Sequence, residues 1–249
     1  MLRFCSFVLL FSCFAASVPL FAAAPGDIII NEVYFNATDG PTNDVEAVEL
    51  LVVTDNVDLT GIQISDRDVW NAPSEEQCTL QDLGQGFLRS VPSGTLIVIY
   101  DGNGTDDTDA SDFVMRFWAR SSLYCNVAPT GRALQLGDHG DNLHLIQGNK
   151  QLDFVKYRAS DRPGAGKGEP GNLNWEKGRE GYIDIGPYRT TRGFRYLGDK
   201  ADLNDFPVAW QVYSETYLEQ NNLGEPNGGR NTTWIEQLRS QHSKPAKKD

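Results

Sequence analysis

Residues 27–35 read DIIINEVYF and residues 45–53 read VEAVELLVV, and these two runs decide the fold class. Both are rich in the β-branched and apolar residues that favour strands, and the first opens directly after a Pro25-Gly26 turn. The second is apolar on both faces towards its end, which is typical of a central strand in a sandwich. The two runs therefore predict a β-rich fold.

Further strands and few helices are expected along the rest of the chain. The additional strands are expected at 58–66, 95–100, 132–136, 142–147 and 151–157. One helix is expected at 109–121, capped by Asp109 or Ser111, and a second at 232–241. Seven short strands with frequent turns predict an all-β, antiparallel sandwich with long loop insertions and one or two short helices.

The composition excludes some functional classes. The chain has 249 residues, 22 basic and 34 acidic side chains, a formal net charge of −12 and a hydrophobic fraction of 40%. This fraction is sufficient for a core, so the chain is not of the disordered type. The acidity argues against binding of nucleic-acid phosphates or anionic membranes, because both need clustered Lys and Arg.

The acidic side chains are unevenly distributed: residues 27–112 hold 18 of them, against only two basic side chains, Arg67 and Arg89. Internal pairing of the charges and two separate charged surfaces both remain open.

Residues 1–24 have the plan of a secretory signal peptide. Arg3 provides a short positive start, an apolar stretch runs over 4–14, and small residues close the segment, which predicts cleavage near Ala23 or Ala24. A transmembrane anchor is the alternative, but the apolar run is short for a bilayer. The prediction is export to the extracellular space, or to the periplasm if the host is bacterial.

Cysteine usage fits that compartment. Cys5 and Cys13 would leave with the signal peptide, so the exported chain keeps Cys78 and Cys125. An even pair in an oxidising compartment predicts one disulfide, with two separate buried thiols as the alternative. A zinc site is not expected, because neither cysteine has a CxxC partner or a nearby His.

Three glycosylation sequons occur, at Asn36, Asn103 and Asn231. They predict modification only in a eukaryotic host. Because such short motifs recur by chance, they do not identify the host.

Six short motifs stand in order along the chain, followed by a closing segment. They are INEV (30–33), VEL (48–50), DLTGIQISD (58–66), PSGTLIVI (92–99), GDNLHL (140–145) and LDFVKY (152–157), closed by Trp210 and GEPN (224–227). In this order they resemble the lamin tail domain family. The resemblance implies an immunoglobulin-like β-sandwich within a domain at 25–230. The remaining residues, 231–249, are expected to form the C-terminal helix and a polar tail.

The chain departs from that family by extra material at about 67–91, 101–125 and 159–205. Insertions of this kind are where a function of its own would lie. In exported proteins the domain typically serves interaction or surface attachment. The resemblance therefore implies an exported, non-enzymatic recognition or adhesion module with a protein or glycan ligand, by analogy, since a fold does not determine a function.

The acidic loop at 101–112 has the residue types of a calcium site. Its oxygen donors are Asp101, Asn103, Thr105, Asp106, Asp109 and Asp112, and Ca²⁺ prefers such hard ligands. The span equals that of an EF-hand loop, but Asp106 stands where that loop has Gly and Asp112 where it has Glu. A solvated acidic loop that caps the helix at Asp109 is the alternative.

Sequence motifs for catalysis are missing. The chain has no GxSxG, no HExxH and no cysteine with a matching His. Glu32 and Glu49 are a formal candidate for a catalytic carboxylate pair, but on core strands we expect them to accept hydrogen bonds. An exported calcium-assisted hydrolase, such as a nuclease or esterase, is the alternative to the recognition module. Nucleic-acid binding is disfavoured by export and acidity.

Overall fold

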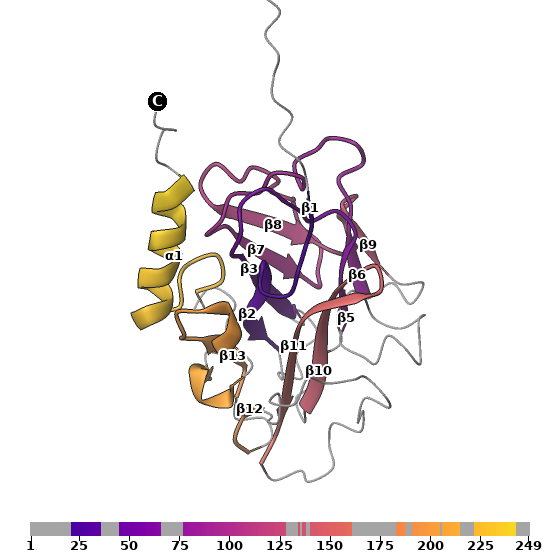
Figure 1. The fold of residues 1–249 in the computed structure, drawn as a ribbon. Coiled ribbons are helices and arrows are strands. Elements are labelled where there is room, and N and C mark those ends of the chain that lie inside the picture. Colours follow the sequence, from indigo (N-terminus) through magenta and orange to yellow (C-terminus); the bar gives the residue numbers. More distant parts are fainter. Residues whose placement is uncertain are drawn as a thin grey trace, which may run out of the picture.

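Two β-sheets that share one hydrophobic core form the body of the protein (Figure 1). The computed structural model describes residues 21–35, 45–65, 77–127, 134, 136–137, 140–160, 183–187, 191–204, 206–214 and 222–242. Within these residues each of the two sheets has six strands, and a single long helix, α1 (Gly229–His242), lies along the side of the sandwich. The predicted all-β sandwich is confirmed.

The first sheet, named here the β2 sheet, has the order β14-β13-β2-β3-β7-β8. Its strands are β2 (Ile28–Tyr34), β3 (Ala47–Val52), β7 (Leu96–Tyr100), β8 (Val114–Trp118), β13 (Gly193–Tyr196) and β14 (Trp210–Tyr213). β2 and β3 are buried along their whole length, as the continuous apolar runs in the sequence predict for central strands.

The second sheet, the β10 sheet, has the order β12-β11-β10-β5-β6-β9. Its strands are β5 (Ile62–Ser65), β6 (Gln77–Leu80), β9 (Cys125–Val127), β10 (Gly140–Gln147), β11 (Lys150–Arg158) and β12 (Ile183–Asp184). A separate two-stranded ribbon joins β1 (Phe21–Ala22) to β4 (Val57–Asp58). Most pairs are antiparallel, but β7–β8, β11–β12 and β1–β4 are parallel, so both sheets are mixed.

The expected strands at 27–35, 45–53, 95–100, 142–147 and 151–157 are confirmed within two residues at each end, as β2, β3, β7, β10 and β11. The expected strand at 58–66 is divided, because a turn at Thr60-Gly61 separates β4 from β5. At 132–136 the described residues Leu134 and Leu136 are buried but lie outside any strand. The other residues of that range lie outside the described part.

The helix expected at 109–121 is wrong, because this segment contains β8, paired in parallel with β7. The Asp109 carboxylate accepts the Ser111 N–H and the Asp112 carboxylate accepts the Val114 N–H, so the acidic side chains form local turns instead of capping a helix. Phe113, at φ 66°, then lies in the left-handed region and ends any helical path. The C-terminal helix expected at 232–241 is confirmed and begins three residues earlier.

A β-bulge in β2 joins the two sheets and α1. The β2–β3 register shifts between Ile30 and Glu32, so Asn31 is the extra residue. The Ile30 N–H donates to Asp153 Oδ2 of β11 in the other sheet, at 2.7 Å. The Asn31 side chain turns the other way and accepts from the Asn231 amide of α1 at 2.9 Å.

No helix in the described residues is long and apolar enough to cross a membrane.

Candidate functional site: a loop surface beside the disulfide

The acidic loop at 101–112 covers the edge of the β2 sheet. Asp107 forms a β-bridge with Arg116 of β8, through two backbone hydrogen bonds of 2.8 and 2.9 Å. The Asp106 carboxylate accepts the Trp118 N–H at 2.8 Å. Because an uncovered edge strand is a template for association with another chain, the loop protects β8 from such pairing.

The six predicted calcium ligands are not brought together. Asp101 is buried and forms a bidentate pair with Arg120, with distances of 2.8 and 3.2 Å. Asn103 and Thr105 are exposed, and Asp106, Asp109 and Asp112 each accept a backbone N–H. Within the described residues no group of three or more His, Cys, Asp or Glu could hold a metal ion. The geometry therefore gives the calcium prediction no support.

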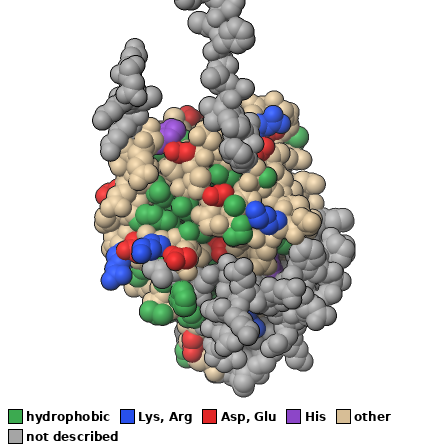
Figure 2. Space-filling model, in the orientation of Figure 1, with side chains coloured by type: hydrophobic (Ala, Val, Ile, Leu, Met, Phe, Trp, Pro, Cys, Tyr) green, Lys and Arg blue, Asp and Glu red, His purple; other side chains and the backbone are tan. Residues whose placement is uncertain are grey.

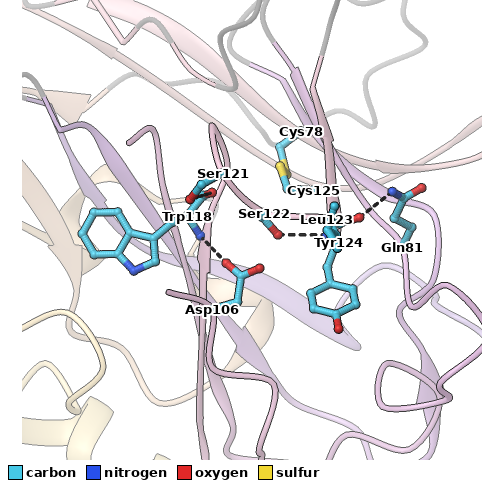
Figure 3. Close-up of a disulfide and its surroundings, with 9 residues drawn as sticks. All are labelled: Cys78, Gln81, Asp106, Trp118, Ser121, Ser122, Leu123, Tyr124 and Cys125. Atoms are coloured by element: carbon cyan, nitrogen blue, oxygen red, sulfur yellow. Dashed lines mark hydrogen bonds between the residues drawn. A yellow bond between two sulfur atoms is a disulfide. The ribbon is translucent and has the colours of Figure 1, made fainter. Parts of the chain in front are cut away.

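The first two insertions meet at the disulfide. Cys78 of β6 is bonded to Cys125 of β9, with their Cα atoms 5.5 Å apart. The β6–β9 ladder continues beyond the bond, because the Gln81 N–H donates to the Tyr124 carbonyl at 2.9 Å. The Gln81 side chain adds a bond of 2.7 Å to the Leu123 carbonyl (Figure 3). The predicted disulfide is confirmed, and it holds together two segments that the sequence shows as separate.

Each of the two insertions carries an exposed leucine next to these contacts in the chain, and we name Leu83, Gln85, Leu123 and Tyr124 together the disulfide-end surface. The side chain of Leu83 is 56% exposed and that of Leu123 is 71% exposed. Gln85 Nε2 donates to the Tyr124 hydroxyl at 3.0 Å, so the two insertions also touch through side chains. The Tyr124 ring packs edge-on against Phe87, with centroids 4.9 Å apart.

The backbone beneath both leucines is held in place. Asp82 is buried and accepts the N–H groups of Gly84 and Gly86 while pairing with Arg89 at 3.4 Å. This network keeps Leu83 at φ 51°, a conformation that costs energy for a residue with a side chain. Sequence reasoning missed both leucines. The available signal is an isolated Leu within turn residues, as in Asp82-Leu83-Gly84.

Charged side chains pair locally within each of the first two insertions. Arg89 lies 3.4 Å from Asp82, Arg116 lies 3.8 Å from Asp107 and Arg120 lies 2.8 Å from Asp101. On the face drawn in Figure 2, acidic and basic side chains are interspersed with hydrophobic ones.

Glu32 and Glu49 stand opposite each other on β2 and β3, and both are fully buried. Glu49 accepts the Asn31 amide at 2.7 Å and the Gly224 N–H at 2.6 Å, while Glu32 accepts the Tyr213 hydroxyl at 2.8 Å. The expectation that they accept hydrogen bonds is confirmed. Neither carboxylate reaches the surface: Glu49 holds Gly224 of the closing segment to β3, and Glu32 holds Tyr213 of β14 to β2.

Burial raises the pKa of Glu49 from 4.5 to about 7, against the opposing effect of its two N–H donors and of Arg116 and Arg239. A raised pKa in the folded state means that the folded protein holds this proton more tightly. The associated stability is present below pH 4.5 and is lost as the pH rises through 7. We expect the free energy of unfolding of the wild type, relative to Glu49→Gln, to fall by about 3 kcal/mol over this interval.

Urea titrations of both proteins at several pH values measure this difference. The Gln variant is the reference because it cannot ionise at this position. Parallel pH profiles for the two proteins would contradict the raised pKa.

The three sequons differ in how accessible their asparagine side chains are. Asn103 is exposed on the acidic loop, and Asn36 lies outside the described residues. Asn231 is fully buried in α1, where its amide donates to Asn31 Oδ1 at 2.9 Å and its carbonyl accepts the Asn227 N–H at 2.9 Å. A glycan attaches to the same amide nitrogen, so glycosylation of Asn231 is incompatible with this fold.

The third insertion, 159–205, is described only at its ends and around β12 and β13. The disulfide-end surface is therefore defined from residues of the first two insertions. The chain matches no protein-family model, no curated protein and no solved structure.

Proposed function

We propose that the protein is an exported, non-enzymatic recognition module that binds a protein or glycan ligand through the disulfide-end surface. The observation that carries the proposal is the pair of exposed leucines, Leu83 and Leu123, on backbone that is already fixed by hydrogen bonds and a disulfide. Apolar anchors presented on rigid loops lose little entropy on binding, which favours recognition.

Two further features support this proposal. The Cys78–Cys125 disulfide supports export, since disulfides persist in oxidising compartments. The lamin-tail resemblance supports an interaction role by analogy with the exported domains of that family. Most of the short motifs that carry the resemblance lie on strands of the sandwich, among them β2, β3, β7, β10 and β11. The disulfide-end surface lies in the insertions, where this chain departs from the motif pattern, so its ligand would be its own.

A binding screen tests the proposal. Displayed peptides and an immobilised glycan panel are probed with the wild type, with Leu83→Ser/Leu123→Ser, and with Val208→Ser, a matched control whose side chain is 91% exposed elsewhere. We expect the double variant to bind selected ligands roughly 30–1,000-fold more weakly, since hot-spot side chains contribute about 1–2 kcal/mol each. The control should bind like the wild type.

Two results would count against this function. Ligands that bind the double variant as tightly as the wild type would remove the disulfide-end surface from recognition. Turnover of nuclease or esterase substrates by the purified protein would contradict the non-enzymatic assignment. Far-ultraviolet circular dichroism of each variant shows that a loss of binding does not come from unfolding.

A further inference from the structure

The residues predicted to end the signal peptide belong to the folded body. Phe21–Ala22 pair in parallel with Val57–Asp58 as the β1–β4 ribbon. Ala23 is 1% exposed and belongs to the hydrophobic core cluster. Its N–H donates to Gln147 Oε1 at 2.8 Å, and its carbonyl accepts from Lys150 Nζ at 3.3 Å. Cleavage after Ala23 or Ala24 would remove all these contacts.

The side chain of Gln147 is oriented to accept a hydrogen bond from this segment. Its amide nitrogen donates to the carbonyls of Asp58 and Thr60, at 2.8 and 3.0 Å. This orientation turns its carbonyl oxygen towards Ala23. Without Ala23 this half-buried acceptor would lose its protein partner. The side chain of Asp27 makes a similar contact, since it accepts the Ala24 N–H at 2.7 Å.

The chemistry of the cleavable bonds agrees with this contact pattern. Signal peptidases require small residues one and three places before the cut. Cleavage after Ala23 would place Phe21 at the third position, and cleavage after Ala24 would cut the tertiary amide before Pro25. Cleavage after Ser17 places Ser17 and Ala15 at the two positions, directly after the apolar stretch.

We propose that the exported chain keeps Phe21–Ala24 as part of its fold and that the leader is removed at the Ser17–Val18 bond. A signal peptidase would hydrolyse this amide with one water molecule, leaving a carboxylate on Ser17 and a new amino group on Val18. The inference rests on the export stated under the proposed function, and it assigns a processing site that differs from the one the sequence pattern predicts.

Expression of the full chain in a secreting host tests the proposal, with intact mass and N-terminal sequencing of the exported protein. The expected N-terminus is Val18. A chain that begins at Ala23, Ala24 or Pro25 would overturn the inference while leaving export intact. A chain that keeps Met1 would overturn both the inference and the export proposal.

Truncation tests the structural part separately. Chains that begin at Val18 or at Pro25 are produced behind an unrelated leader, each with and without Gln147→Ala. We expect the Pro25 chain to melt about 5 °C lower, because it loses buried hydrogen bonds and a packed Ala. Gln147→Ala should lower the melting temperature of the Val18 chain more than that of the Pro25 chain, because the two changes remove a shared contact. The exposed control Gln237→Ala should affect both equally. Equal melting temperatures of the Val18 and Pro25 chains would overturn the proposal.

Discussion

Asp153→Ala is expected to lower the free energy of unfolding by about 4 kcal/mol, because it leaves two buried N–H donors without an acceptor, at about 1–3 kcal/mol each. Asp153 is 2% exposed, and its Oδ2 accepts the Ile30 N–H at 2.7 Å and the Asn204 amide at 2.6 Å. The Ile30 bond crosses from one sheet to the other at the bulge. No neighbouring strand can replace it there, because the register is interrupted at this position.

Denaturant unfolding of three variants measures this effect. Asp153→Asn keeps one carbonyl oxygen in nearly the same volume, so it should lose less stability than Asp153→Ala. Asp109→Ala also removes a carboxylate that accepts a backbone N–H, but an exposed one, and should stay close to the wild type. If Asp153→Ala and Asp109→Ala lowered the free energy of unfolding by the same small amount, the cross-sheet hydrogen bond would not be a major contribution to stability.

Removal of the disulfide is expected to have a similarly large effect. Cys78 and Cys125 are 47 positions apart in the chain, and closing a loop of that length lowers the entropy of the unfolded state by an amount equivalent to about 4 kcal/mol. The double variant Cys78→Ala/Cys125→Ala should lose this stability. It should also loosen the end of the β6–β9 ladder that holds Leu123 in place.

Urea unfolding with and without a reductant separates the bond from the side chains. A reductant should destabilise the wild type by about the same amount as the double substitution, and it should leave the variant unchanged. A loss below about 1 kcal/mol in the variant would contradict this account, because it would mean that opening the loop adds little entropy to the unfolded chain.

Local patterns were sufficient for much of the framework. The apolar runs that became β2, β3, β7, β10 and β11 carry their own strand signal, because burial on a pleated strand appears in neighbouring residues. The C-terminal helix was also predictable from the sequence. The segment at 109–121 was not, because its Asp-rich start resembles a helix cap and only pairing with β7 shows that 114–118 is extended.

The candidate site could not be predicted in the same way. The sequence showed six oxygen donors within 12 residues, but each carboxylate found a different partner, such as Arg120 for Asp101 and the Trp118 N–H for Asp106. Likewise, Glu49 and Asn231 look unrelated in the sequence, and both are bound to the bulge residue Asn31. Residue type states what a side chain can bind, whereas the partner depends on segments far away in the chain.

The all-β class, the central strands, the C-terminal helix and the cysteine pair can all be read from the chain before it folds, because these features follow from composition and short-range periodicity. Only the packed chain shows that the first two insertions meet at the disulfide, that Leu83 and Leu123 are exposed, and that Asn231 is closed to a glycan. The physical reason is that exposure and convergence depend on which distant segments pack together. Nearest-neighbour patterns do not contain that information.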